Sequence, residues 1–395
     1  MHVLRRRTAA TAGTAALAGS LLVLSSLGGC AAGRADSSPT GRTEHQRTTA
    51  AAPDGESIAA YLRRTLPKGV SGTVIAARGG HLAHCGGFGT ADRAAGVPAG
   101  CRTVYDVMSI TKQFTAAAIL KLDVMGRLRV EDRIGRHLGP GAVPGDKRAI
   151  TVENLLTHTS GLAEGLGGDY APVSRDELVR NALASKLRSA PGKGFHYSNV
   201  GYSLLAAIVE KASGESYERF LARHLFAPAG MRSTGYVLPR WPRRLIAVEY
   251  DAKGRSQGRP VDHPWAADGP YWNLRGNGGM LSTAPDMLRW SRALSDDTVL
   301  PASARRRLFA PRVRVPGSDS RYAYGWNIRD LGSGRLAWHD GGNGWSLALL
   351  ARAQPDDVLV HWVSNHAYRK GRWNMEDRAE ELTLGLIARA RAGEG

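Results

Sequence analysis

The stretch that decides the fold is SITKQFTAAAILKLDVM, residues 109–125, which Gly126 follows. Apolar residues occupy nearly every side of a helix drawn through it, and a glycine directly after such a run is a common helix end. A helix that is apolar nearly all round lies inside a protein rather than on its surface. The sequence therefore predicts a buried central helix that begins at Ser109.

Strand-like patterns occur on both sides of this helix, near the two ends of the chain. Residues 69–78 and 81–92 predict a β-hairpin, and residues 58–66 before them predict a short helix. A final helix is expected from about Glu376. Three further stretches predict C-terminal strands separated by Gly, Asn and Pro-Asp-Asp turns: 335–341, 345–353 and 357–365.

The middle of the chain is mainly helical in pattern. LLTHTSGL at 155–162, SNVGYSLLAAIVEKASG at 198–214 and YERFLARHLF at 217–226 all favour helix. Strands at both ends with helices between them imply one antiparallel sheet that the two chain ends complete. The expected fold class is therefore α/β (α+β), a sheet flanked by helices with an inserted, mainly helical lobe.

The N-terminal residues predict export. Three arginines at 5–7 precede a run of small and apolar residues at 12–27, which is typical of a secretory signal and short for a transmembrane span. The LGGC that ends at Cys30 resembles a bacterial lipobox, whose cysteine is lipidated and becomes the new N-terminus. A plain signal peptide with an accidental cysteine is the alternative, and Sec and Tat export both stay open.

This pattern divides the chain into three parts. Residues 1–29 are a lipoprotein signal peptide, and residues 30–55, rich in Ala, Thr, Ser, Gly and Pro, are a flexible tether. Residues 56–395 form the folded domain. We expect the protein to lie outside the cytoplasm, anchored to the outer face of the bacterial cell membrane through lipid on Cys30, or secreted if that cysteine is not modified.

The formal charge of +18 favours anionic partners, but its source weakens that interpretation. Arginine accounts for 44 of the 53 basic residues, and the arginines are scattered rather than grouped. No zinc-finger spacing or nucleic-acid motif is visible. We therefore expect no nucleic-acid partner.

The cysteines predict a disulfide. If Cys30 is lipidated, Cys85 and Cys101 remain as an even pair in an oxidising compartment. A loop of that size would stabilise the fold by roughly 3 kcal/mol. Two buried free thiols are the alternative. His81 and His84 beside Cys85 offer only three metal ligands on a hairpin, so we predict no metal site there.

Ser109 and Lys112 are the centre of the chemical argument. Residues three apart at a helix start lie on one face, so the lysine side chain can reach the serine hydroxyl. Unpaired N-H groups at a helix start favour a developing oxyanion. An apolar buried helix lowers a lysine pKa by desolvation, which produces a neutral amine able to activate the serine. S-x-x-K occurs only here in the chain.

Tyr197 and Asn199 form the second element, just ahead of a predicted helix. A phenol can relay a proton between nucleophile and leaving group once nearby cations favour its phenolate. The Asn199 amide can orient a substrate carbonyl and hold the lysine. Tyr271 and Asn273 match the same Y-x-N spacing. We favour the first match because it precedes a helix, whereas the second lies in a Gly- and Pro-rich loop.

The third element is His339-Asp340-Gly341, on the first C-terminal strand. A strand edge beside the nucleophile can offer a backbone N-H to an oxyanion, and glycine permits a close approach to that edge. His84-Cys85-Gly86 also fits H-x-G, so the position of the motif matters more than its letters. We interpret His158, in the THTSG stretch, as a structural residue at a helix end rather than a base.

S-x-x-K, Y-x-N and H-x-G in this order resemble the serine penicillin-recognising superfamily. The chain looks most like the branch with class C β-lactamases, D-alanyl-D-alanine carboxypeptidases, D-aminopeptidases and related esterases, over roughly residues 57–390. Further family-like stretches are 155–162, 191–205, 230–231, 278–283 and 324–326. The resemblance implies a β-lactamase/transpeptidase-like fold and an acyl-enzyme cycle without metal or organic cofactor.

By that resemblance, Ser109 attacks a carbonyl, and Lys112 and Tyr197 manage its proton. Asn199 positions the substrate, and His339 takes the place of the usual third-motif base. The N-H groups of Ser109 and Gly342 would form the oxyanion hole.

Asp340 departs from the family pattern. Many relatives that bind a substrate carboxylate have a small hydroxyl residue there, whereas an aspartate would repel an anion. We therefore expect a monomeric serine hydrolase for esters, amides or D-amino-acid peptides, β-lactams included. A D-alanyl-D-alanine carboxypeptidase, a β-lactamase proper, and a lipoprotein that binds β-lactams or wall peptides without turnover are the alternatives.

Overall fold

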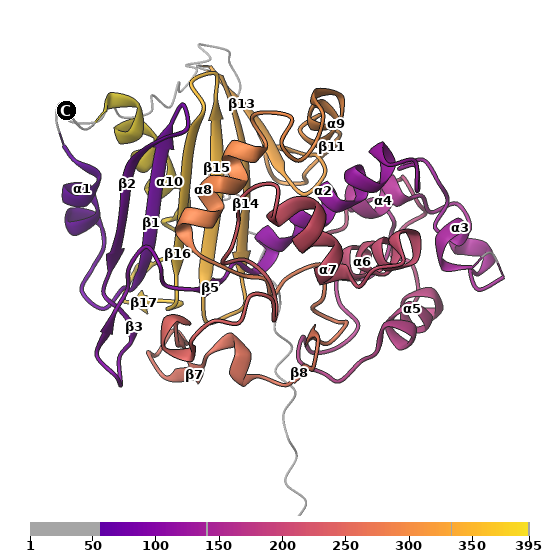
Figure 1. The fold of residues 1–395 in the computed structure, drawn as a ribbon, viewed down its shortest axis with the longest axis horizontal. Helices are drawn as coiled ribbons and strands as arrows, with labels where there is room; N and C mark the ends of the chain where they lie inside the picture. Colours follow the sequence, from indigo (N-terminus) through magenta and orange to yellow (C-terminus); the bar gives the residue numbers. More distant parts are fainter. Residues whose placement is uncertain (1–55, 140, 333, 394–395) are drawn as a thin grey trace, which may run out of the picture.

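The computed structural model describes residues 56–139, 141–332 and 334–393. The predicted signal peptide, Cys30 and the predicted tether all lie outside them. The expected fold is confirmed: strands from the N-terminal part of the chain lie beside C-terminal strands in one antiparallel sheet, and a helical lobe is inserted between them (Figure 1).

The sheet has eight strands within the described residues, and every neighbouring pair is antiparallel. In spatial order they are β11 (Val313–Arg314), β12 (Arg321–Tyr322), β13 (Asn327–Leu331), β14 (Gly334–Gly342), β15 (Leu347–Gln354), β16 (Val358–Ser364), β1 (Gly72–Arg78) and β2 (His81–Phe88). Five short pairs are β3 (Thr90–Asp92) with β4 (Val97–Pro98), β5 (Tyr105–Asp106) with β10 (Leu281–Ser282), β6 (Glu249–Tyr250) with β7 (Ser256–Gly258), β8 (Trp265–Ala266) with β9 (Gly269–Pro270), and β17 (Arg369–Lys370) with β18 (Trp373–Asn374).

The helices occupy both faces of the sheet and the inserted lobe. They are α1 (Ile58–Thr65), α2 (Thr111–Val124), α3 (Gly135–Leu138), α4 (Val152–Leu156), α5 (Arg175–Ala184), α6 (Asn199–Ser213), α7 (Tyr217–Leu221), α8 (Ala284–Ala293), α9 (Ala302–Leu308) and α10 (Ala379–Ala392). Short irregular turns are η1 (Met108–Ile110), η2 (Gly145–Lys147), η3 (Ala222–Phe226), η4 (Arg243–Leu245) and η5 (Pro260–Asp262). The last helix begins at Ala379, three residues later than expected.

Strand alternation divides the core in two. On β1, Val74 and Ala76 pack with α1 and α10, whereas Ile75 and Ala77 pack on the opposite face with the core that contains α2 and α8. One face of β15 and β16 continues the first core layer, and the opposite face continues the second. This explains why the central strands read as almost continuous apolar runs: they are buried on both sides.

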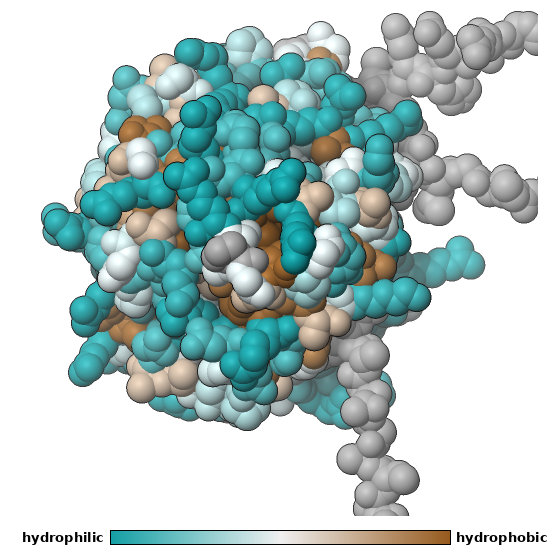
Figure 2. Space-filling view, turned by 90° about the vertical axis from the view of Figure 1, so that its right-hand side faces the viewer, coloured by the Kyte–Doolittle hydropathy of each residue, from teal (hydrophilic) through white to brown (hydrophobic). Residues whose placement is uncertain are grey.

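The α2 helix lies where the sheet meets the helical lobe, in contact with α6, α7 and α9 (Figure 1). Eleven of its residues are buried, as the apolar pattern predicted. The outer face of the lobe is mainly hydrophilic, with hydrophobic residues gathered near its centre (Figure 2). No helix in the described ranges combines the length and apolar character that a bilayer span requires.

Candidate active site

Ser109 sits in the short turn η1 rather than in the helix itself, because α2 begins two residues later at Thr111. Met108, immediately before it, has a φ of 49°, a left-handed conformation that is costly for a side chain with a Cβ. The Asp106 carboxylate accepts the Met108 N-H at 2.6 Å. This bond holds the strained backbone at Met108, where the chain turns from β5 toward the start of α2.

Lys112 contacts Ser109 directly. Its Nζ lies 2.9 Å from Ser109 Oγ, 2.8 Å from Asn199 Oδ1 and 2.8 Å from the backbone carbonyl oxygen of Asn277. The residue is fully buried, and burial lowers the pKa of the ammonium from 10.5 to about 7, against the opposing charges of nearby carboxylates. A neutral amine has two N-H groups and one lone pair. It can donate to the two carbonyl oxygens and accept the proton of Ser109.

Tyr197 and Asn199 reach the same serine from the start of α6. Tyr197 donates its O-H to Ser109 Oγ at 3.0 Å, and Asn199 is the first residue of the helix. The Ser198 hydroxyl between them caps the helix by accepting the Gly201 N-H at 3.0 Å. Burial raises the pKa of Tyr197 well above its ordinary value. The phenolate that we expected is therefore wrong for the resting site: Tyr197 is a neutral donor.

His158 packs against the ring of Tyr197. Its Nδ1 accepts the N-H of Ser198 at 3.0 Å, and its ring centroid lies 4.3 Å from that of Tyr197. The residue is fully buried with a φ of 57°, and burial lowers its pKa well below the usual value. Its ring thus lies against Tyr197 and its Nδ1 is bonded to the backbone at the start of α6.

The C-terminal end of β14 forms the other wall of the site. The pairing of β13 with β14 ends at Trp338, so residues 339–342 face the site with an edge that β13 does not cover. A Cβ on Gly341 would lie 2.8 Å from Ser109 N and 2.8 Å from Met108 Cβ. Only glycine allows this approach, which brings the Ser109 N-H against the strand that carries Gly342.

His339 lies on this strand but both of its ring nitrogens are occupied. Its Nδ1 donates to the Asp340 carbonyl oxygen at 2.6 Å, which leaves Nε2 to accept the Tyr322 O-H at 3.0 Å. The ring is buried, and burial together with the Lys112 charge lowers its pKa to about 3. His339 is thus a neutral ring in the wall of the site, without a free nitrogen for proton transfer.

Asp340 pairs with Leu349 across the sheet, so its side chain leaves β14 on the face opposite His339. Its charge still acts on the site, because it raises the pKa values of both Lys112 and Tyr197. Glu164, whose carbonyl oxygen accepts the Asn199 N-H at 2.8 Å, and Asp169 also raise the pKa of Lys112. Ser109 and Lys112 thus have acidic surroundings in a strongly basic chain.

Comparison with known proteins agrees with this geometry. A family model described as Beta-lactamase matches residues 58–384. The chain belongs to the beta-lactamase family. It is 31% identical over 309 residues to a penicillin-binding protein of Bacillus subtilis strain 168, a match that covers 74% of this chain and 67% of that protein. It is 28% identical over 307 residues to the D-alanyl-D-alanine-carboxypeptidase/endopeptidase AmpH of Escherichia coli strain K12, covering 72% and 76% of the two chains.

Solved structures show the same fold. The D-amino acid amidase of Ochrobactrum anthropi SV3, solved with D-phenylalanine, superposes with a TM-score of 0.69 at 21% identity, covering 84% of this chain and 95% of that one. At this identity the likeness concerns the fold alone. It extends the β-lactamase/transpeptidase-like architecture over nearly all of the described residues.

The competing motifs of this beta-lactamase-family chain lie elsewhere or act differently. Asn273 donates its side-chain amide to the Gly168 carbonyl oxygen at 3.0 Å, and Tyr271 has no hydrogen bond to Ser109. His84 lies on β2, the edge strand at the far end of the sheet order. Cys85, next to it, is bonded to Cys101 in a disulfide. No group of three or more His, Cys, Asp or Glu suited to a metal occurs in the described part of the chain.

Two parts of the site escaped the sequence motifs. The first is Asn277, whose backbone carbonyl oxygen accepts from Lys112. The signal was present in the glycine-rich stretch at 278–283, but a backbone acceptor has no residue-type signature. Its side chain, buried and bonded to Ser203 Oγ and the Asn273 carbonyl oxygen at 2.8 Å each, fixes that acceptor.

The second is a pair of buried carboxyl groups, Asp106 and Glu249, which are bonded to the segments on either side of the site. Asp106 holds Met108, and Glu249 accepts from Asn343 Nδ2 at 2.8 Å in the turn after β14. Burial raises both pKa values, and the charge of Glu249 raises that of Asp106 further. The pair therefore supports both the turn before Ser109 and the turn after β14.

Proposed function

We propose that this protein is an exported serine hydrolase that forms an acyl-enzyme at Ser109. One observation carries the proposal: a buried lysine with a pKa of about 7 and a neutral tyrosine both lie within hydrogen-bond distance of Ser109 Oγ. Such a constellation activates a serine, since a base and an acid meet at one hydroxyl. Export and anchoring through Cys30 rest on the N-terminal sequence.

The steps follow from the hydrogen bonds. Neutral Lys112 takes the Ser109 proton while Oγ bonds to the substrate carbonyl carbon, and the N-H groups of Ser109 and Gly342 stabilise the oxyanion. When the tetrahedral species collapses, the bond to the leaving group breaks, and Tyr197 gives that group its proton. The proton held by Lys112 then restores the phenol. Water attacks the acyl ester in the same manner and releases the acid.

The acidic surroundings support a substrate class. Asp340, Glu164 and Asp169 all oppose a negative charge near Lys112. We infer that esters, amides or D-amino-acid peptides without a free carboxylate at the reacting end are preferred. A carboxypeptidase or β-lactamase proper would have to overcome this repulsion. The name of the Escherichia coli relative keeps the carboxypeptidase as the second candidate.

The test of the function is Ser109→Ala. We expect it to abolish covalent labelling by a serine-directed phosphonate and to lower ester hydrolysis by at least about 10³-fold. Turnover of an aryl ester, a D-Ala-D-Ala peptide and a fluorescent penicillin by the wild type then ranks the candidates. Labelling without turnover of any of them would favour a binding protein, and intact labelling in the variant would refute the assignment.

The test of the substrate class is Asp340→Thr with matched substrates that differ only in a free carboxylate. We expect the variant to gain on the carboxylate substrate alone, by up to about tenfold for a half-buried charge. Equal effects on both substrates would mean that Asp340 does not discriminate.

The anchor needs a separate test, because it depends only on the N-terminal sequence. Mass analysis of the mature protein in the membrane fraction should find a lipid on Cys30. A different N-terminus would refute the tether.

A further inference from the structure

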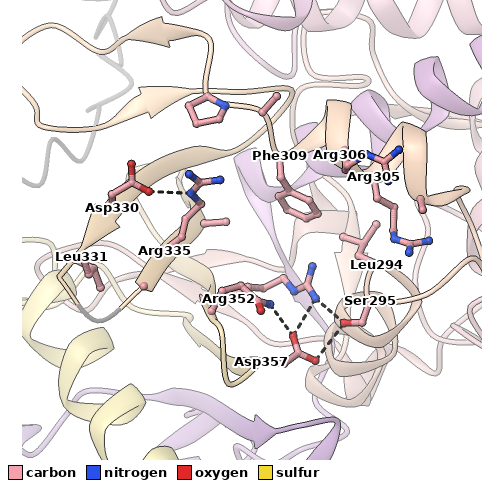
Figure 3. A pocket seen from close by; sticks show the side chains of 16 residues that line it. Leu294, Ser295, Arg305, Arg306, Phe309, Asp330, Leu331, Arg335, Arg352 and Asp357 are labelled. Atoms are coloured by element: carbon pink, nitrogen blue, oxygen red, sulfur yellow. Dashed lines mark hydrogen bonds and ion pairs between the residues drawn. The ribbon is translucent and has the colours of Figure 1, made fainter.

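A cavity lies away from Ser109, at the other end of β14. Its volume is about 1090 Å³, and its walls come from β13, β14 and β15 together with α9 and the end of α8 (Figure 3). It shares no lining residue with the candidate active site. β14 reaches both places, since it supplies Arg335 to this cavity and His339 to the candidate active site.

The cavity has an excess of positive charge. Four arginines line it against two carboxylates, those of Asp330 and Asp357, and one of the four, Arg305, pairs with Asp297 just outside the lining. Arg335 pairs with Asp330 at 2.8 Å, but both side chains are well exposed, so the pair is weak. Arg306 has no hydrogen-bond or ion-pair partner anywhere in the described ranges.

Arg352 is the buried cation of the group. Its side chain is 6% exposed, and its Nη2 donates to Ser295 Oγ at 2.6 Å and to Asp357 Oδ1 at 3.1 Å. Its buried Nε has no partner within the described residues. Asp357 also accepts from Gln354, so its charge is shared. The charge of Arg352 is thus met by Asp357, but one buried donor of its guanidinium is left over for a ligand.

Phe309 supplies an apolar surface among these cations. The guanidinium carbon of Arg352 lies 5.4 Å from the centroid of the Phe309 ring. Figure 3 shows Arg335, Arg306 and Arg352 on three sides of this ring. A ligand that rests on the ring would therefore meet guanidinium groups from three separate elements.

We infer that this cavity binds an organic phosphate, with the phosphate among the guanidinium groups and an apolar portion against Phe309. Guanidinium groups match phosphate oxygens with paired hydrogen bonds. The two carboxylates of the cavity are too few to satisfy all four arginines, so a phosphate can bind among them. The volume leaves room for more than a bare phosphate ion, and Phe309 offers an apolar surface to the rest of such a ligand. A free phosphate ester and the headgroup of an anionic lipid share this chemistry.

The experiment is calorimetric titration of Ser109→Ala protein with phenyl phosphate and with inorganic phosphate at low ionic strength. We expect saturable binding of one phenyl phosphate per chain, tighter than that of inorganic phosphate. Arg306→Gln should weaken it by roughly tenfold, the effect of one charge-assisted contact. The control is Arg244→Gln, an equal charge loss at an exposed arginine outside the cavity, which should leave the affinity unchanged.

Sedimentation with phosphatidylglycerol and phosphatidylcholine vesicles distinguishes the ligand sources. Selective binding to phosphatidylglycerol that Arg306→Gln weakens would identify a lipid headgroup, and binding of the soluble probe alone would identify a free phosphate ester. The inference is overturned if phenyl phosphate does not saturate, or if Arg244→Gln weakens binding as much as Arg306→Gln. The latter result would mean general attraction to a basic protein.

Discussion

The pH dependence of acylation tests the role of Lys112 most directly. If its neutral amine is the base, the labelling rate of Ser109 should rise with pH and level off above a midpoint near 7, the pKa that burial produces. The neighbouring histidines do not titrate in this pH range. Burial lowers the pKa of His339 to about 3 and moves that of His158 well below its usual value. Tyr197 titrates far above this range.

The size of the effect follows from the lowered pKa. At pH 7, about half of the Lys112 side chains are neutral, whereas an ordinary lysine with a pKa of 10.5 would be neutral in roughly 3 of 10⁴ molecules. Burial thus increases the population of the base by about 10³-fold. The corresponding free energy is roughly 5 kcal/mol, which the folded chain supplies by enclosing α2.

The assay is the second-order rate of labelling by an uncharged fluorophosphonate between pH 5 and 9. Lys112→Arg keeps a cation that never deprotonates, so it should lose at least about 10³-fold with no rise across pH 7. Asp340→Asn should move the midpoint toward acid, because the Asp340 charge raises the pKa of Lys112. Asp330→Asn, on β13, is the matched control and should leave the midpoint in place.

A labelling rate that stays flat from pH 5 to 9 would refute this reasoning, as would one that falls across pH 7. Either result would mean that Lys112 stays charged and acts by electrostatic stabilisation alone. A midpoint that moves equally in both aspartate variants would instead point to a general effect of net charge.

Four further variants test the second Y-x-N match, a buried carboxyl group and the disulfide. Tyr197→Phe should lower turnover by about 10² to 10⁴, the scale of a lost proton-transfer group, and Tyr271→Phe much less; the reverse order would identify the other Y-x-N match. Glu249→Gln should raise the free energy of unfolding at pH 8 by about 1 kcal/mol and less at pH 5. The sign follows because its raised carboxyl pKa is a cost that grows as pH rises. Unfolding in urea should show a loss of roughly 3 kcal/mol when Cys85 and Cys101 are both replaced by serine.

Much of the fold was predictable because burial leaves clear periodic signals. The run at 109–125 had no polar face, so its place inside the protein followed without any knowledge of its neighbours. The hairpin and the three C-terminal strands had apolar runs separated by turn residues. The helix boundary at Ser109 was less accurate. The strained turn at Met108 depends on a bond from Asp106 that no periodicity reports.

The parts of the site formed by side chains at fixed spacing were predictable. The parts that depend on backbone groups or on the pairing of strands were not. The spacing from Ser109 to Lys112 and from Tyr197 to Asn199 reflects helix geometry, which is local. The carbonyl acceptor on Asn277 and the pairing of Asp340 with Leu349 depend on contacts between distant segments. The neutral state of Tyr197 likewise required its burial, which a motif does not contain.

Net charge and local charge point in opposite directions in this protein. The formal charge of +18 describes a surface field that salt screens within about 10 Å at 0.1 M ionic strength. The carboxylates of Asp340, Glu164 and Asp169 lie close enough to the fully buried Lys112 to raise the pKa of its ammonium. Arginines spread over the surface therefore cannot offset them at the nucleophile. A basic isoelectric point and the proposed preference for substrates without a carboxylate are compatible, because the charges behind them lie at different distances from Ser109.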